Sequence, residues 1–289
     1  MSISNDNPYP AQTGPYRVVV KGGGGRWKDF DTVRLEISVG GENHEGEKFA
    51  ATVEWVRRRF SRSIVCVNDT LQRFNRMFED GLSEDEARAH CAEEGRAWVR
   101  RNHAALRRLP GMELHHWDDW MAAPGFAAVN GLTDRLRGVV PALDAAIAAD
   151  IDDMWRRRQR RMPGLYADHR RAEFSALADR YIAEEIDRFA VILPRDQAVD
   201  LYPGSILRVW QLMDGVSLPG TACLTGGTFT RIDFRRREPH RPTPLSRDWD
   251  HMRRDAAGCS TGRDTERRST SALVDRTGCL SDDPALTLR

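Results

Sequence analysis

The sequence predicts an α/β fold in which a Rossmann-like parallel sheet is flanked by helices. Short apolar runs typical of strands alternate with longer segments whose apolar residues recur every three to four positions, as in amphipathic helices. A strand at residues 32–37, a helix at 47–60 and a strand at 63–67 form a βαβ unit. Such a unit implies two parallel strands joined by a right-handed crossover, which indicates the α/β class.

The first strand is expected at residues 17–20, ahead of the strand at 32–37. Four glycines at 22–25 separate the two. They do not match a phosphate-binding loop, because no Gly-Lys-Ser/Thr follows them and no helix starts there. We therefore expect a flexible loop.

A long helix is expected to start at Ser83 and to end near Leu109. Ser83 and Glu86 have the spacing of a capping box, and Pro110-Gly111 stops the helix. The remaining predicted elements are a strand at 112–116, helical segments at 126–161 and 169–189 broken at Pro141 and Pro163-Gly164, and late strands at 196–201 and 228–234.

Composition divides the 289-residue chain into a flexible extension (1–16), one domain (17–238) and a tail (239–289). The tail is dominated by polar residues, Pro and Gly and has no apolar period, so we expect it to be disordered. The net charge is +1 although 30% of the residues are charged. A near-neutral total therefore conceals local basic surfaces, which matter for anionic partners.

Cysteine usage and apolar runs predict the compartment. The five cysteines show no C-x-x-C and no paired spacing, which indicates reduced thiols. The N-terminus has no secretory pattern, and no apolar run approaches the roughly 18 to 20 residues of a membrane span. We expect a cytoplasmic protein that does not enter a membrane.

Three short motifs could carry chemistry. Ser38 follows a strand and precedes a glycine pair, which places its hydroxyl where open α/β sheets bind ligands. Tyr181 and Glu185 are four residues apart and share a helix face. Tyr202, followed by proline, ends another predicted strand. Taken singly, each motif also fits an ordinary turn or a solvated side chain.

Two other kinds of site are disfavoured. Ser38 lacks the Gly-x-Ser-x-Gly frame of a hydrolase, since Glu36 replaces the first glycine, and no histidine is evidently its base. His115 and His116 could suggest a metal. Adjacent strand residues point to opposite faces, however, and no second ligand cluster accompanies them, so we expect no metal.

Basic residues line one face of the helix that starts at Ser83. Arg96, Arg100, His103 and Arg107 recur at i, i+4, i+7 and i+11, with Arg101 and Arg108 beside them. Such a stripe is often only a solvated face. Clustering on one face also matches a nucleic-acid phosphate backbone. A second run at 156–161 adds basic charge without following one face.

Taken in order, these segments resemble the tRNA-dependent cyclodipeptide synthases over about residues 17–235. The segments that carry the resemblance are Leu35-Glu36-Ile37-Ser38-Val39-Gly40, the helix end from Glu54-Trp55 to Arg59-Phe60, Val65-Cys66-Val67-Asn68-Asp69-Thr70, the arginine helix, Tyr181-Ile182-Ala183-Glu184-Glu185 and Tyr202-Pro203. Members of the family look like the catalytic domain of class I tyrosyl- and tryptophanyl-tRNA synthetases. The chain lacks the His-x-Gly-His and Lys-Met-Ser-Lys-Ser motifs of those enzymes, so it would use amino acids that are already activated.

The resemblance implies a monomeric enzyme that joins the amino acids of two aminoacyl-tRNAs into a 2,5-diketopiperazine, without ATP, metal or another cofactor. Ser38 would carry the aminoacyl and then the dipeptidyl group. Tyr181 and Glu185 would hold the amino group, with Glu185 as proton acceptor, and Tyr202 would relay a proton. The tRNA acceptor arm would lie on Arg96, Arg100, Arg101, Arg107 and Arg108.

Two positions indicate one of the family's two groups. Gly41 stands where one group has an Asn near the nucleophile, and Tyr202 precedes Pro203 rather than His or Gln. Both features match the Tyr-Pro group without the Asn. Another residue must then fix the nucleophile loop.

The resemblance also places a set of residues near the first aminoacyl pocket: Glu36, Gly40, Cys66, Trp117, Arg188, Phe189 and Asp200. Two carboxylates would be uncompensated beside an apolar amino acid, so we expect a polar or cationic first residue such as His or Arg. In the alternative, Glu36 and Asp200 pair with Arg188 or another nearby arginine.

Two other functions stay open from the sequence. A serine hydrolase or acyltransferase would use Ser38 and would act on p-nitrophenyl esters. A non-catalytic RNA-binding protein would use the arginine helix and would be unaffected by Ser38→Ala. The RNA-binding alternative leaves the serine, Tyr/Glu and Tyr-Pro motifs unexplained.

Overall fold

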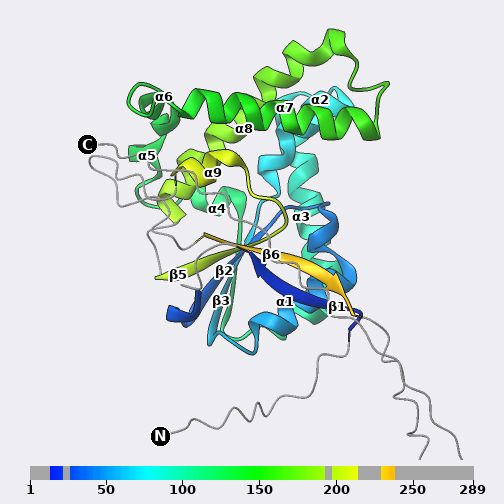
Figure 1. Ribbon diagram of the computed structural model, residues 1–289, viewed down its shortest axis with the longest axis vertical. Helices are drawn as coiled ribbons and strands as arrows, with labels where there is room; N and C mark the ends of the chain where they lie inside the picture. Colours follow the sequence, from blue (N-terminus) through cyan, green and yellow to red (C-terminus); the bar gives the residue numbers. More distant parts are fainter. Residues whose placement is uncertain (1–13, 22–26, 193–196, 214–228, 238–289) are drawn as a thin grey trace, which may run out of the picture. The chain divides into compact units, whose positions relative to one another are not determined.

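A six-stranded sheet lies at the centre of the part of the chain that the structure describes (Figure 1). In this computed structural model that part comprises residues 14–21, 27–192, 197–213 and 229–237, all within the unit Met1–Arg237. Residues 1–13 of the predicted extension, the predicted glycine loop and the predicted tail lie outside it, as do Asp196 and Thr228 of the late strands.

The strands follow the order β1-β6-β5-β2-β3-β4 across the sheet. They are β1 (Tyr16–Lys21), β2 (Thr32–Ile37), β3 (Arg62–Val67), β4 (Met112–His116), β5 (Ala198–Pro203) and β6 (Phe229–Arg236). The strands from β6 to β4 pair in parallel, which confirms the predicted Rossmann-like sheet. The strand β1 differs from the others, since it pairs antiparallel with β6. As an edge strand beside the last strand, β1 needs no crossover helix, and such mixed edges are common.

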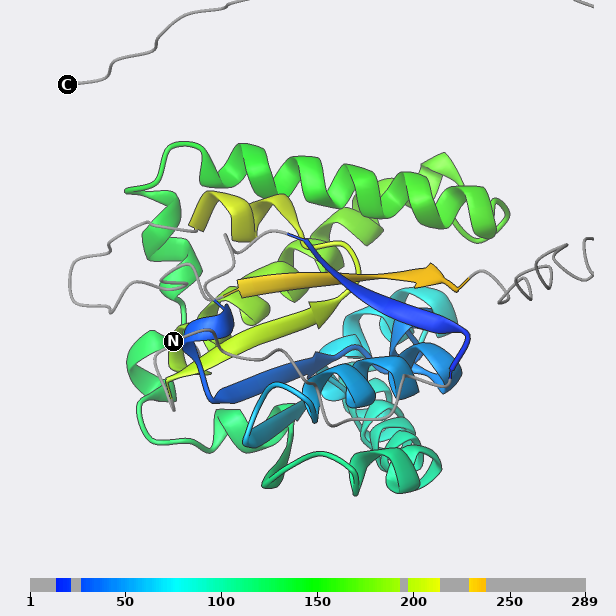
Figure 2. The same ribbon diagram turned by 60° about the horizontal axis from the view of Figure 1, so that its bottom comes forward.

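Helices cover both faces of this sheet (Figure 2). In the described residues they are α1 (Gly46–Val56), α2 (Arg73–Asp80), α3 (Glu84–Leu106), α4 (Trp117–Met121), α5 (Phe126–Val129), α6 (Leu132–Arg137), α7 (Leu143–Arg161), α8 (Arg171–Ile192) and α9 (Arg208–Met213). The predicted segment at 126–161 is divided into α5, α6 and α7. Short α2, α4 and α9 were not predicted, because so few residues give no clear period.

The capping box at the start of α3 is confirmed. Ser83 Oγ accepts from Glu86 N, and the Glu86 carboxylate accepts from Ser83 N at 3.0 Å. These bonds satisfy backbone donors at the helix start. The helix ends at Leu106, slightly before the predicted position.

Side-chain alternation along β2 sends residues into two different layers. Val33, Leu35 and Ile37 pack with α1 and α3 in one apolar core. A second core joins β3 to α2, α4, α7 and α8 on the other face of the sheet. On that face β2 presents Arg34 and Glu36, both fully buried. None of the helices within the described ranges combines the length and the apolarity that crossing a membrane requires.

Candidate functional site

Ser38 and Tyr202 lie at the carboxyl ends of neighbouring parallel strands. Ser38 directly follows β2, and Tyr202 belongs to β5. Because Leu35 pairs with Leu201, Ser38 and Tyr202 project from the same face of the sheet. Ser38 Oγ and Tyr202 OH are 3.2 Å apart, a hydrogen bond in which either hydroxyl can donate. Two motifs far apart in the sequence therefore meet at one point.

A tight turn follows Ser38. Gly41 N donates to Ser38 O at 3.0 Å, and Gly40 has a φ of +79°. Glycine adopts this left-handed conformation readily, whereas other residues are strained there. The predicted role of the glycine pair in a sharp backbone turn is therefore visible in the structure.

The helix α8 presents Tyr181 and Glu185 to the same region. Tyr181 OH accepts a 3.4 Å hydrogen bond from Gln72 Nε2. Burial, followed by the nearby Glu185 and Tyr202, raises the pKa of Tyr181 well above its ordinary value. Its phenol therefore stays protonated and can donate a hydrogen bond.

Glu185 is a carboxyl group held in its neutral form. Burial, with a smaller contribution from Asp150, raises the pKa of Glu185 to about 8. Glu185 Oε2 is buried, and no described residue forms a hydrogen bond with it. A buried acid that lacks a partner can receive a polar group of a ligand.

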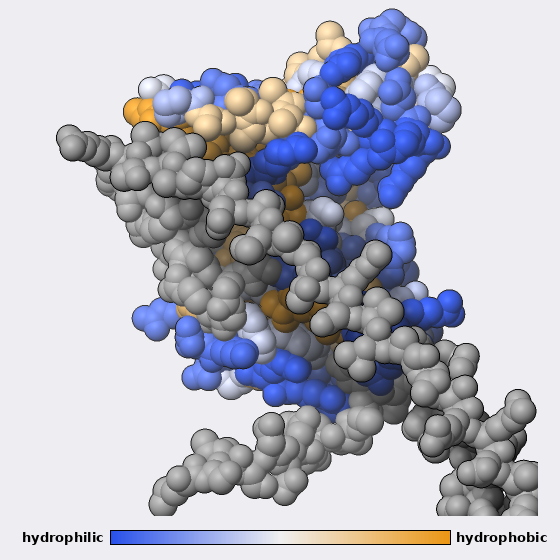
Figure 3. Space-filling model, viewed as in Figure 1, coloured by the Kyte–Doolittle hydropathy of each residue, from blue (hydrophilic) through white to orange (hydrophobic). Residues whose placement is uncertain are grey.

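All four predicted catalytic residues line one cavity of about 290 Å³. Its wall has an apolar part made by Met154, Ile206, Leu207, Trp210 and Phe229, and a polar part made by Gln72, Asn75, Arg157, Arg158, Arg161 and Ser205. Trp210 and Phe229 are stacked, with ring centroids 5.8 Å apart. Figure 3 shows hydrophilic surface over the end of α7, which carries the three arginines.

The residues predicted for the first aminoacyl pocket are not part of this wall. Glu36, Cys66 and Asp200 are fully buried within the sheet layer. Asp200 Oδ1 pairs with Arg34 Nη1 at 2.6 Å. Burial, with Asp200 as a smaller cause, raises the pKa of Glu36 to about 8. Gly40 is exposed in the turn after Ser38.

The other three predicted pocket residues form a buried cluster beside α8. Glu184 accepts from Trp117 Nε1 at 2.9 Å and pairs with Arg188 at 3.1 Å. Phe189 packs edge-on against Trp117, with ring centroids 5.9 Å apart. Arg188 therefore pairs with Glu184. Glu184 and Arg188 stand four residues apart on α8, a spacing that brings the two side chains together on one helix face, so this pair follows from the sequence.

The predicted arginine stripe on α3 is exposed, but acidic side chains accompany it. Arg96 and Arg100 both pair with Glu93, at 2.8 and 2.7 Å. Arg101 pairs with Glu45 at 3.0 Å, and Arg108 pairs with Glu54 at 2.6 Å. Arg107 caps the end of the helix. Surface pairs of this kind are weak, so a phosphate can compete for the arginines.

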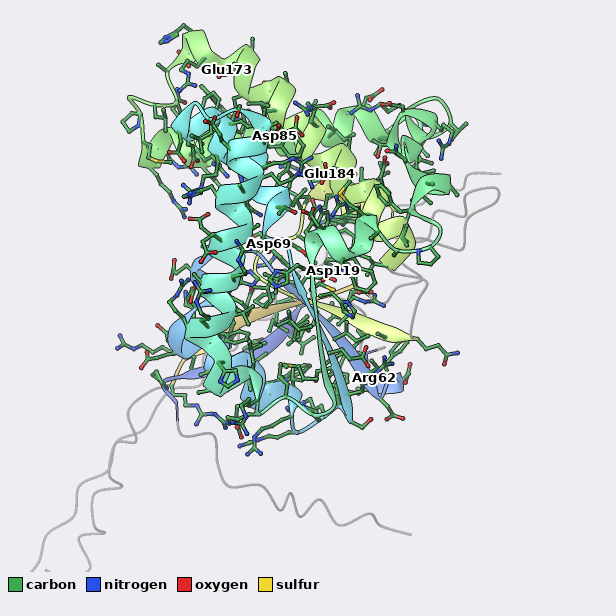
Figure 4. All side chains as sticks on the ribbon, turned by 180° about the vertical axis from the view of Figure 1, so that it is seen from behind. Arg62, Asp69, Asp85, Asp119, Glu173 and Glu184 are labelled. Atoms are coloured by element: carbon green, nitrogen blue, oxygen red, sulfur yellow. The ribbon has the colours of Figure 1, made fainter. Side chains whose placement is uncertain are left out.

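The two histidines of β4 diverge. His116 Nδ1 lies 2.6 Å from Asp69 Oδ2, whereas His115 packs against Trp120 with ring centroids 4.7 Å apart. Figure 4 shows Asp69 and Asp119 beyond the strand ends, with Glu184 above them on α8. The described residues contain no group of three or more His, Cys, Asp or Glu that could hold a metal ion.

Much of the cavity wall was not predicted. Asn75 comes from α2, the arginines from α7, and Ser205 to Trp210 from the segment after β5. The basic run at 156–161 was the only signal in the sequence, and it did not indicate which arginines face the cavity.

Comparison with known proteins shows the fold. No protein-family model and no curated protein sequence matches the chain. A solved cyclodipeptide synthase from Fluoribacter dumoffii is 22% identical with a TM-score of 0.66, covering 78% of this chain and all of that chain.

Two further solved structures have the same fold. A cyclodipeptide synthase from Candidatus Glomeribacter gigasporarum bound to Phe-tRNAPhe is 15% identical with a TM-score of 0.54, covering 75% of this chain and 92% of that chain. A Mycobacterium tuberculosis protein, described as demonstrating that cyclodipeptide synthetases are related to type I tRNA synthetases, is 14% identical with a TM-score of 0.53, covering 82% and 100%. The chain therefore has the Rossmann-like fold of these proteins.

Proposed function

We propose that the chain is a cyclodipeptide synthase of the Tyr-Pro group, an aminoacyltransferase that uses two aminoacyl-tRNAs. The observation that carries this proposal is the meeting of Ser38, Tyr181, Glu185 and Tyr202 on one cavity. The likeness of the fold to solved cyclodipeptide synthases supports it. An ester to tRNA is already activated, so the transfer requires no ATP.

In the first transfer, Ser38 Oγ attacks the ester carbonyl of one aminoacyl-tRNA. The bond to the terminal ribose breaks, and the ribose oxygen leaves with a proton. Tyr202, 3.2 Å from Ser38, is placed to pass the proton from Ser38 towards that oxygen. Backbone N–H groups of Val39 and Gly40 would stabilise the oxyanion, by about 3 to 4 kcal/mol for each donor.

In the second transfer, the amine of the aminoacyl-enzyme attacks the ester carbonyl of the second aminoacyl-tRNA and forms the peptide bond. The bond to the second terminal ribose breaks, and that ribose oxygen leaves with a proton. The ionised fraction of Glu185 accepts the proton from this amine, and Tyr181 orients the amine. The pKa of Glu185 is about 8, close to the 7.7 to 8.0 of an α-amino group, so a proton moves between them at little cost. The free amine of the dipeptidyl-enzyme then attacks the Ser38 ester, which closes the ring and returns the proton to Ser38.

The tRNA is proposed to lie with its acceptor arm on the α3 arginines. Arg157, Arg158 and Arg161 add positive charge at the cavity itself, where the ester must enter. We also propose that the enzyme is a monomer and that it acts in the cytoplasm, as the sequence analysis predicts.

A compensated Asp200 and a neutral Glu36 weaken the argument for a cationic first amino acid. The predicted preference assumed uncompensated charges at Glu36 and Asp200. Asp200 instead pairs with Arg34, and the raised pKa of Glu36 keeps its carboxyl largely protonated at neutral pH. The electrostatic argument for a cationic side chain therefore loses its basis.

The hydrolase alternative lacks a base. Among the described residues no histidine forms a hydrogen bond with Ser38, whose one recorded side-chain partner is Tyr202. The pKa of His44, which packs against Tyr202, is lowered to about 3 by burial. A histidine in that state cannot activate a serine near neutral pH.

The test is mass spectrometry of the medium of bacteria that express the chain. Wild type and Ser205→Ala are expected to release a cyclic dipeptide, whereas Ser38→Ala releases none. Ser205 lines the same cavity, so it is a matched control for removal of a hydroxyl. Cleavage of p-nitrophenyl esters without any cyclic dipeptide would contradict the proposal in favour of a hydrolase.

A further inference from the structure

The turn between β2 and α1 carries a buried histidine that the proposed mechanism does not use. His44 ends the short 3-10 helix Glu42–His44 and is 2% exposed. No described residue forms a hydrogen bond with its Nδ1. Burying a polar atom without a partner costs free energy, so hydrogen bonding through Nδ1 does not account for this residue, and the contacts of its ring are the feature to consider. Since burial lowers its pKa to about 3, the ring is neutral and is not a base.

The ring of His44 fills the space beneath the Ser38 turn. Gly41 N donates to Ser38 O at 3.0 Å, and His44 N donates to Gly41 O at 2.9 Å, so successive turns connect the two side chains. A Cβ on Gly41 would lie 2.8 Å from His44 Cδ2. Only glycine fits at position 41 while the ring occupies its place.

The same ring contacts Tyr202. The two ring centroids are 5.3 Å apart with an interplanar angle of 53°. The neighbouring Asn43 lies against Gly204, where a Cβ would be 3.2 Å from Asn43 Nδ2. The 3-10 helix therefore touches both the loop that carries Ser38 and the strand end that carries Tyr202.

The core holds His44 from the opposite side. Trp98 Nε1 of α3 donates to His44 O at 3.0 Å, and Trp98 is fully buried. Trp98 packs edge-on against Phe49 of α1, with ring centroids 5.1 Å apart. The position of His44 is thus set by two helices of the core.

We propose that His44 is a positioning residue that keeps Ser38 Oγ and Tyr202 OH within hydrogen-bond distance. This inference rests on the proposed function, and it identifies the group that fixes the nucleophile loop in a chain with Gly41 at the position of the Asn. The bond between the two hydroxyls is 3.2 Å long, whereas O–H···O bonds are usually about 2.7 to 2.8 Å. A small displacement of either side chain would break it.

Removing the ring tests the proposal. His44→Ala is expected to lower kcat for cyclic dipeptide formation by about 10- to 100-fold, because misplacement by about 1 Å has effects of this size. KM for aminoacyl-tRNA should stay nearly unchanged, since the RNA contacts lie elsewhere. Val56→Ala, a buried truncation in the same core layer, is the control for lost stability and should keep its kcat. A wild-type kcat in His44→Ala would overturn the proposal.

His44→Phe separates packing from proton transfer. Phenylalanine keeps a ring at this position but can neither titrate nor bond through nitrogen. We expect it to restore most of the rate lost in His44→Ala, with an unchanged pH profile. A protein with wild-type Tm but the rate of His44→Ala would show that the imidazole itself is needed, which contradicts a positioning role.

A double-mutant cycle tests the contact without any substrate. Gly41→Ala should lower Tm because its Cβ would lie 2.8 Å from the ring and 3.0 Å from Ser38 O. It should lower Tm less when combined with His44→Ala, which removes the contact with the ring but leaves the contact with Ser38 O. Gly164→Ala, whose Cβ meets nothing within 4 Å, is the control. Strictly additive losses would contradict the inference. Absence of any cyclic dipeptide from wild type would instead overturn the proposed function, and the Tm cycle would still decide whether the His44 ring packs against position 41.

Discussion

Glu36 is a fully buried carboxyl group on a central strand, two residues before Ser38. One of its oxygens, Oε2, accepts from Asn68 Nδ2 at 3.4 Å, and Oε1 has no hydrogen-bond partner among the described residues. Burial, followed by the negative charge of Asp200, raises its pKa to about 8. Glu36 therefore keeps its proton at neutral pH in the folded protein.

The raised pKa of Glu36 predicts that stability falls with rising pH. The unfolded chain releases this proton above its ordinary pKa of 4.5, while the folded protein holds it up to about 8. The free energy of unfolding accordingly decreases between these values as pH rises. Glu36→Gln should raise Tm at pH 9 by about 2 to 4 °C, which is the effect of about 1 kcal/mol in a domain of this size.

The measurement is thermal unfolding of wild type and Glu36→Gln at pH 6 and pH 9. The gain from the substitution should be larger at pH 9. An equal change at both pH values would show that Glu36 is ionised throughout.

Tyr202→Phe is predicted to separate catalysis from folding. It removes the hydroxyl that bonds to Ser38 but keeps the ring that packs on His44. We expect kcat to fall by about 100-fold or more, as for loss of a proton-transfer group. Tm should change little. Steady-state kinetics measure kcat, and a melting curve measures Tm. A wild-type kcat in Tyr202→Phe would show that the Tyr202 hydroxyl takes no part in the reaction.

At the scale of elements, α3 approaches the strand ends closely because Gly95 has no side chain. A Cβ there would lie 2.1 Å from Asp69 Oδ2. Asp69 in turn accepts from Thr70 N at 2.8 Å and contacts His116 Nδ1 at 2.6 Å. The glycine thus lets one carboxylate organise the ends of β3 and β4.

Gly95→Ala is predicted to destabilise the fold although alanine is the better helix former. The clash with Asp69 should cost about 1 to 3 kcal/mol, more than the gain of about 1 kcal/mol in helix propensity. Gly138→Ala is the control, since its Cβ would meet only Arg135 O at 3.5 Å. Chemical unfolding measures the change in the free energy of unfolding for both variants. A more stable Gly95→Ala would show that the Asp69 side chain shifts to avoid the added Cβ at little cost.

The pairing of the α3 arginines with Glu93 predicts that removal of one acidic side chain tightens the binding of tRNA. Arg96 and Arg100 share Glu93 as their acidic partner. Glu93→Gln should release both arginines and tighten tRNA binding, while Arg96→Ala with Arg100→Ala should weaken it and lower the salt slope by about one for each lost phosphate contact. Titrations of tRNA at several salt concentrations decide this. Unchanged affinity in both variants would place the tRNA elsewhere.

At the scale of the whole molecule, β6 is the last strand of the sheet along the described chain, and it ends at Arg236. The backbone N–H of Arg237 donates to Pro15 O at 2.7 Å, beside β1. A chain that stops after Arg237 therefore keeps every described element. We predict that this truncation preserves Tm and cyclic dipeptide formation, and loss of either in the purified truncated protein would show that residues 238–289 contribute.

The fold was predictable because its signals are local. The alternation of β2 and the period of α1 are written in consecutive residues, and Ser83 with Glu86 marks the start of α3. The antiparallel direction of β1 was not predictable in this way. It depends on pairing with β6 from the other end of the domain, which no local pattern encodes.

The meeting of the four candidate catalytic residues on one cavity could also be expected, because each motif sits at a strand end or on one helix face. The partners of the residues predicted for the first aminoacyl pocket were harder to predict. Asp200 pairs with Arg34, which is distant in the sequence, whereas the pairing of Arg188 with Glu184 follows the i, i+4 spacing of one helix. The sequence offered no reason to connect His44 with Gly41 and Tyr202.

Local chemistry thus defined the class of fold, the helix caps, the glycine turn after Ser38 and the residue types available for acyl transfer. Three-dimensional packing alone decided that Arg34 compensates Asp200, which side chains line the cavity and that the His44 ring lies beside Gly41 and Tyr202. The physical reason is that propensity and periodicity act between neighbours along the chain. Burial, ion pairing and pKa depend instead on groups that only folding brings together.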